Sequence, residues 1–68
     1  MGIMKIIELV GVSKESSDRA VREAVYEAGK TIRGISHIEV TRVECVVSEN
    51  DIVEWHATVK LRFPVERS

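Results

Sequence analysis

Residues 55–63 have the sequence WHATVKLRF, and this stretch decides the fold. Apolar and polar side chains alternate through it, a period of two that is typical of a β-strand with one apolar and one polar face. The pattern continues in both directions and predicts a strand from Ile52 to Val65. The predicted apolar face carries Trp55, Ala57, Val59, Leu61 and Phe63, and the opposite face carries His56, Thr58, Lys60 and Arg62.

A second run of period two, from Ile35 to Val47, precedes this strand, and the polar residues 48–51 separate the two runs. This arrangement predicts a β-hairpin with a two-residue loop at Glu49 and Asn50. The resulting register pairs residues of like face or opposite charge across the hairpin. The expected pairs are Glu39 with Lys60, Thr41 with Thr58, Ile38 with Leu61, His37 with Arg62 and Val43 with His56.

A further strand is predicted at Met4–Val12, which is rich in β-branched and apolar residues and precedes a polar cluster. A helix is predicted near residues 17–33, with serine N-caps before it and Gly34 after it. One face of this helix is apolar at the spacing expected for a buried stripe. That stripe consists of Val21, Ala24, Val25, Ala28 and Ile32.

These elements predict an α+β fold of order β-α-β-β, with one helix on a three-stranded antiparallel sheet. We expect the helix stripe to meet apolar residues of all three strands, namely Ile7, Leu9, Ile38, Val40, Val59, Leu61 and Phe63. A helix is about 10 Å wide, so the long hairpin should project beyond it. The exposed tip would carry an apolar patch formed by Val43, Cys45, Val46, Val47, Ile52 and Val53.

The chain has 68 residues, which we interpret as a single domain spanning residues 1–68. A domain this short buries only about 60% of its unfolded surface and needs a further source of stability. Cys45 is the only cysteine, which excludes an internal disulfide, and the chain lacks the ligands for a structural zinc site. Self-assembly is therefore the expected stabiliser, and edge strands and the bare hairpin support it.

Ten basic and eleven acidic residues give a net charge of -1, which argues against nucleic acid or an anionic membrane as a partner. The sequence contains neither a secretion signal nor an apolar run of about 18 residues, so a cytoplasmic location is expected. It also lacks a nucleophile with a neighbouring base, a phosphate-binding loop and a metal-ligand cluster. We therefore predict a protein that is not an enzyme.

The candidate site is the polar sheet face, with His37 and His56 on different strands. The two histidines are not adjacent within one subunit, so they are either surface residues or parts of a site formed between subunits. Metal ligation by both is the sharper alternative. Carboxylates near the hairpin tip are a solubilising turn or, if another subunit completes the shell, calcium ligands. These carboxylates are Glu44, Glu49, Asp51 and Glu54.

Several strings together resemble the dodecins, small β-α-β-β proteins that assemble as hollow dodecamers and bind flavins. The resemblance covers nearly the whole chain. It lies in IELVG at 7–11 leading into SKES at 13–16, in KTIR at 30–33, in HIEV at 37–40, and in the strand from Trp55-His56 to Phe63. It implies a homododecamer with riboflavin, FMN or FAD as its cofactor.

The resemblance also identifies His37 and His56 as cofactor-binding residues. In the family, a tryptophan that stacks on the flavin ring occupies the position of His37, and a glutamine that hydrogen-bonds the ring occupies that of His56. Since imidazole offers less aromatic area than indole, we expect flavin affinity to be weaker or absent. The chain is also similar to the branch without the tryptophan, which includes calcium-binding members. A metal-binding assembly and a structural or protein-interaction module are the alternative functions.

Overall fold

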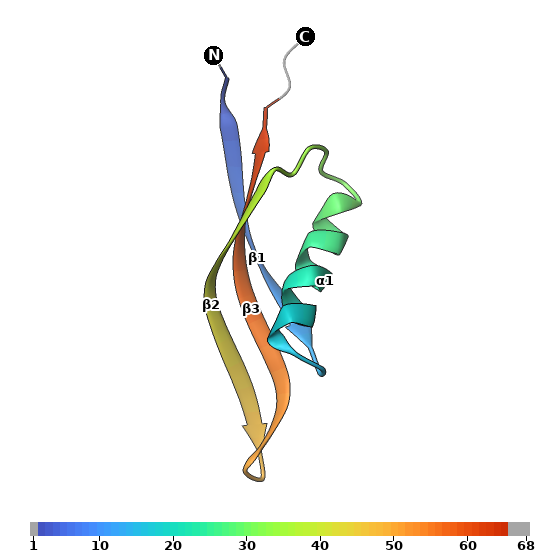
Figure 1. Ribbon diagram of the computed structural model, residues 1–68, viewed down its shortest axis with the longest axis vertical. Coiled ribbons are helices and arrows are strands. Elements are labelled where there is room, and N and C mark those ends of the chain that lie inside the picture. Colours follow the sequence, from blue (N-terminus) through green and yellow to red (C-terminus); the bar gives the residue numbers. More distant parts are fainter. Residues whose placement is uncertain (1, 66–68) are drawn as a thin grey trace.

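The computed structural model describes residues 2–65 and has the element order β-α-β-β (Figure 1). The elements are β1 (Met4–Ser13), α1 (Ser17–Gly29), β2 (His37–Ser48) and β3 (Asp51–Pro64). The strands form one antiparallel sheet of order β1-β3-β2, and α1 lies across one of its faces. The predicted α+β fold is confirmed. The predicted domain, 1–68, includes residues 1 and 66–68, which lie outside the described residues.

Helix α1 begins where the sequence predicts and ends earlier. The hydroxyl oxygen of Ser16 accepts a hydrogen bond from the backbone N–H of Arg19 at 3.0 Å, which caps the first turn. The predicted end near residue 33 is wrong, because the helix ends at Gly29, a residue of low helix propensity. The backbone N–H of Ile32 turns back to the carbonyl of Ala28, and Gly34, with φ of 74°, redirects the chain toward β2.

The hairpin has the predicted turn but a modified register. Glu49 and Asn50 have φ of 52° and 65°, the left-handed values that a two-residue hairpin loop requires. The predicted pairs of β2 with β3 hold from His37 to Val40. A bulge at Thr41 then shifts the register, so the predicted partners of Thr41 and Val43 are wrong. Arg42 pairs with Thr58, and Glu44 pairs with His56.

The core lies between α1 and the two strands β1 and β3. Ile38 and Val40, which we expected to meet the helix, are exposed. The strand order explains this difference, because β2 is an edge strand and a helix about 10 Å wide covers only about two strands spaced ~4.8 Å apart. Phe63 is half-buried. The core consists of Ala24, Ala28, Val59 and Leu61, packed against Ile7, Leu9, Val21, Val25, Ile32 and Ile35.

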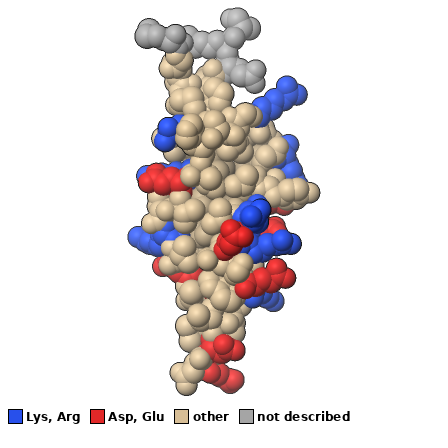
Figure 2. All heavy atoms as spheres, in the orientation of Figure 1, with Lys and Arg blue, Asp and Glu red and all other residues tan. Residues whose placement is uncertain are grey.

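The molecule is elongated, with extents of 54 × 20 × 12 Å, and the hairpin of β2 and β3 projects past the helix (Figure 1). The predicted apolar tip is exposed, as is the free thiol of Cys45. Figure 2 shows acidic side chains at the same end of the molecule. No helix within residues 2–65 has the length and apolar character needed to span a membrane.

Candidate functional site

The sheet face opposite α1, here called the open face, has no helix packed on it among residues 2–65 (Figure 1). Its central row comes from β3, whose alternate residues Ala57, Val59 and Leu61 are buried on the helix side. The register then assigns the flanking residues of β1 and β2 to the same face. From β3 the open face carries His56, Thr58, Lys60 and Arg62. From β2 it carries His37, Glu39, Arg42 and Glu44, and from β1 it carries Ile6, Glu8, Val10 and Val12.

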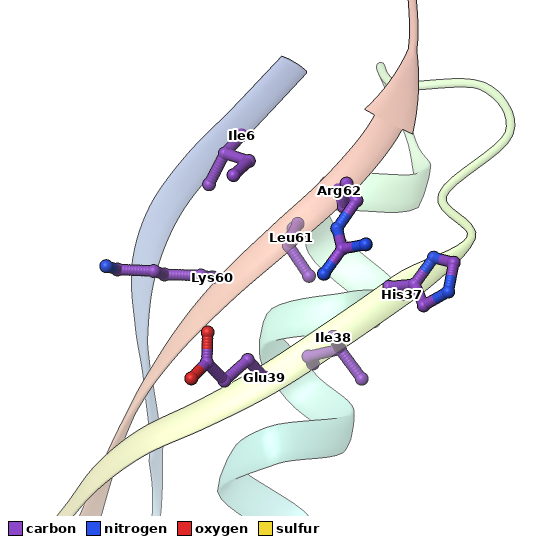
Figure 3. A pocket seen from close by; sticks show the side chains of 7 residues that line it. All are labelled: Ile6, His37, Ile38, Glu39, Lys60, Leu61 and Arg62. Carbon is purple, nitrogen blue, oxygen red and sulfur yellow. The ribbon is translucent and has the colours of Figure 1, made fainter. Parts of the chain in front are cut away.

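A small hollow of about 100 Å³ marks the His37 end of the open face. His37 on β2 is the cross-strand partner of Arg62 on β3. Figure 3 shows the Arg62 guanidinium between these two strands and the His37 ring at the edge of β2. The hollow is therefore lined by an aromatic ring, cations, one carboxylate and aliphatic side chains. Its residues are Ile6, His37, Ile38, Glu39, Lys60, Leu61 and Arg62.

The His37 ring is oriented by the serine that precedes it. The Ser36 hydroxyl donates to the carbonyl oxygen of Arg62 at 3.3 Å, and its oxygen lies 2.9 Å from Nδ1 of His37. When the single hydroxyl hydrogen is used in the first bond, Nδ1–H of His37 donates in the second. In the neutral ring this leaves Nε2 as an exposed acceptor, available to a ligand proton or to a metal ion.

Two cations line the hollow together with His37, with the Lys60 ammonium on the side of β1 and the His37 ring at the edge of β2 (Figure 3). Lys60 and Arg62 take part in none of the ion pairs formed among the described residues. Glu39, the cross-strand partner of Lys60, is exposed and forms no ion pair with it there. An ammonium and a guanidinium in this position can donate to carbonyl, carboxylate or phosphate oxygens.

His56 has a different environment, nearer the hairpin tip. Its Nε2 lies 2.8 Å from Oε1 of Glu54, and both side chains are half-buried. Glu44 is its partner across the β2–β3 pair. The bulge at Thr41 creates this acidic surrounding, since the regular register would place Val43 there. The sequence reasoning missed the bulge, which coincides with the adjacent polar residues Thr41 and Arg42. The hydrogen bond from the Thr41 hydroxyl to the carbonyl oxygen of Thr58, at 3.2 Å, marks it in the structure.

The two histidines share the open face but not a site within one subunit. His37 pairs with Arg62, six positions after His56 on β3, and at ~3.3 Å per residue this separation is about 20 Å. His56 does not line the hollow at His37. A shared ligand for both histidines thus stays a prediction that requires a second subunit.

The structure also places the other predicted site residues. Within residues 2–65, no three His, Cys, Asp or Glu side chains come close enough together to hold a metal ion. The tip carboxylates Glu49 and Asp51 are exposed. Cys45 lies opposite Trp55, which belongs to the predicted apolar face of β3 and is half-buried.

An apolar row on β1 escaped the sequence reasoning. Ile6 and Val10 lie on the open face with 58% and 56% of their surfaces exposed, and Val12 beside them is exposed too. The open face is therefore only partly polar. The sequence did indicate this apolar row, because β1 has apolar residues at both odd-numbered and even-numbered positions. Such a pattern is typical of a strand that is covered on both faces.

Comparison with known proteins identifies relatives of one kind. The sequence model of the dodecin family matches residues 3–66. A dodecin from Thermus thermophilus is 29% identical over 66 residues, which cover 97% of this chain and 96% of that protein. The solved dodecin of Streptomyces coelicolor has a TM-score of 0.93 at 34% identity, with 98% of this chain and 96% of that one covered. The calcium dodecin of Mycobacterium tuberculosis shares the fold, with a TM-score of 0.83, 23% identity and coverage of 97% and 94%.

Proposed function

The chain belongs to the dodecin family, and from this premise we propose that it is a non-enzymatic homododecamer that binds a flavin, either riboflavin, FMN or FAD. The observation that carries the proposal is the hollow on the open face, whose lining includes the exposed residue His37 and the cations Lys60 and Arg62. An aromatic ring with neighbouring hydrogen-bond donors is the combination that a planar, oxygen-rich ligand requires. The lone thiol of Cys45 favours a reducing compartment, and we propose the cytoplasm.

The residues that line the hollow of one subunit fit half of a flavin site, and a second subunit would supply the other half. A hollow of about 100 Å³ is small beside the ~300–1,000 Å³ of a typical ligand pocket. Because a twofold interface brings the same patch of two subunits together, two such hollows would enclose a larger space. In that arrangement His37 would stack on the ring, while Lys60 and Arg62 would donate to its oxygens or to a phosphate. When bound, the flavin is cargo to be held, and we propose no reaction on it.

His56 enters this proposal through a neighbouring subunit. It stands at the position where the dodecins have a glutamine that hydrogen-bonds the flavin ring. With Nε2 engaged by Glu54 at 2.8 Å, Nδ1 is the nitrogen of His56 left for a ligand. The separation of His56 from His37 within one subunit requires that the two residues of one site come from different copies.

A metal ion is the second candidate ligand. In the tautomer in which Nδ1–H of His37 donates to Ser36 at 2.9 Å, Nε2 is left for a metal ion, and such a second-sphere bond is typical of metal-binding histidines. Calcium prefers six to eight oxygen ligands, so it would use carboxylates such as Glu44 and Glu54 rather than imidazole. The name of the Mycobacterium tuberculosis relative, calcium dodecin, adds support for calcium.

Native mass spectrometry of the purified protein, with and without riboflavin, FMN and calcium, tests both candidates. A dodecamer that gains flavin mass supports flavin binding, whereas a dodecamer that takes up only metal supports the second candidate. A monomer that binds none of these ligands contradicts both and favours a structural or protein-interaction module.

A further inference from the structure

A groove lies at the end of the molecule where β1 begins and β3 ends, next to the linker that follows α1 (Figure 1). Its volume is about 400 Å³, large beside the ~30 Å³ share of one water molecule. Its lining combines four apolar residues with one threonine and two cations. The lining residues are Lys5, Thr31, Ile32, Arg33, Phe63, Pro64 and Val65.

The two groove cations have no acidic partner among residues 2–65, since none of the ion pairs there involves Lys5 or Arg33. Both residues are exposed, and so is Val65 at the groove wall. The groove therefore combines apolar side chains with two cations that form no ion pair among residues 2–65. Such a surface is complementary to an apolar segment that carries carboxylates.

The tip of the β2–β3 hairpin has this complementary chemistry. Val47 is 61% exposed and Ile52 44% exposed, and these apolar residues pair with each other across the hairpin. Glu49 and Asp51 lie at the turn between them. Figure 2 shows acidic side chains at the extreme end of the molecule, where no basic side chain is visible.

We propose that the hairpin tip of one copy docks in the groove of a second copy, with Glu49 and Asp51 facing Lys5 and Arg33. The contact must join different molecules, because the groove and the tip lie at opposite ends of a subunit 54 Å long. A contact between two different patches is heterologous, and repeating it generates a closed ring when the rotation closes. This inference rests on the proposed assembly and adds the contact that would build it.

Reversing the charges tests the contact in the full-length protein. The groove variant is Lys5→Glu with Arg33→Glu, and the tip variant is Glu49→Lys with Asp51→Lys. Each puts like charges in contact, so native mass spectrometry should show loss of the wild-type assembled species. Combining all four substitutions in one chain restores opposite charges and should restore the assembly. The matched control, Lys14→Glu with Arg22→Glu, reverses two cations outside the groove and should leave the copy number unchanged.

The proposal is overturned if the groove and tip variants keep the wild-type copy number. It is also overturned if the four-substitution variant, folded by circular dichroism, does not assemble. In both cases a wild-type oligomer with bound ligand leaves the proposed function standing. A wild-type monomer overturns both.

Zero-length cross-linking of the wild-type protein gives a second test that needs no variant. A carbodiimide joins a lysine ammonium to a carboxylate in direct contact, so peptides from the covalent dimer should contain Lys5 linked to Glu49 or Asp51. A covalent dimer without either product contradicts the contact.

Discussion

His37 on β2 lies directly opposite Arg62 on β3, and both residues line the hollow on the open face. His37→Trp should therefore increase riboflavin affinity, because an indole gives the ligand a larger stacking surface. An aromatic pair contributes about 0.5–1.5 kcal/mol, which corresponds to an increase of up to about tenfold. Quenching of riboflavin fluorescence during titration measures the change.

The control for this substitution is Tyr26→Trp. Tyr26 lies on the outer surface of α1 with 67% of its surface exposed, so this variant adds an indole far from the hollow. Its riboflavin affinity should equal that of the wild type. Equal affinity in both variants would show that His37 does not contact the ligand.

His56→Ala should lower ligand affinity, although His56 lies about 20 Å along β3 from the partner of His37. The loss of one hydrogen bond corresponds to about 0.5–1.5 kcal/mol, or up to about tenfold in affinity. The same fluorescence titration measures it. The companion variant Glu54→Gln keeps the imidazole while removing the carboxylate that lies 2.8 Å from it.

The two variants at this pair separate binding from stability. Since the contact between His56 and Glu54 is half-buried, Glu54→Gln should change the free energy of unfolding by no more than about 1 kcal/mol. If the His56→Ala variant binds flavin as tightly as the wild type, His56 does not contact the ligand. His37 would then be the only histidine of the proposed site.

Gly11→Ala should destabilise the fold, because β1 and α1 pack backbone to backbone at this position. A Cβ atom on Gly11 would overlap the carbonyl oxygen of Ala20, which cannot move without displacing the helix. Overpacking of this kind costs about 1–3 kcal/mol, measured from the midpoint of chemical denaturation. Gly29→Ala is the matched control, since nothing lies within 4 Å of a Cβ there, and it should be neutral or slightly stabilising. An unchanged midpoint for Gly11→Ala would contradict the close packing.

The elements were predictable wherever one side-chain period dominates. The alternation around Val59 and Leu61 identified β3 and its buried face, and the polar residues at Glu49 and Asn50 identified the turn. The helix was predicted too long because Ile32 continues the apolar stripe. Ile32 does pack against the core, but it does so from a turn that follows the helix. A pattern of buried positions thus did not distinguish helical from non-helical backbone.

The site was less predictable than the fold for a physical reason. A bulge shifts the pairing by one residue, so that β2 places His37 and Glu39 on the open face before it and Arg42 and Glu44 after it. We predicted one unbroken alternation along β2 and therefore did not expect Glu44 to lie opposite His56. The edge position of β2 exposed Val40, and this depended on strand order. The residues that would complete a site come from other subunits, whose positions follow from symmetry and not from the period of one chain.

The apolar row on β1 provides a test of assembly that is independent of any ligand. Ile6 and Val10 flank Glu8 on the open face and are 58% and 56% exposed in one subunit. If assembly covers them, each contributes up to about 1.5–3 kcal/mol to the interface.

Ile6→Glu with Val10→Glu would instead require two carboxylates to be buried beside Glu8, at a still larger cost. We expect this variant to lose the dodecamer in size-exclusion chromatography with light scattering. Because a 68-residue domain has little core of its own, its unfolding midpoint should fall as well. Tyr26→Glu, which places a carboxylate at an equally exposed position on the outer surface of α1, should leave both measurements unchanged. A dodecamer that survives both β1 substitutions would mean that the open face of β1 is not an interface.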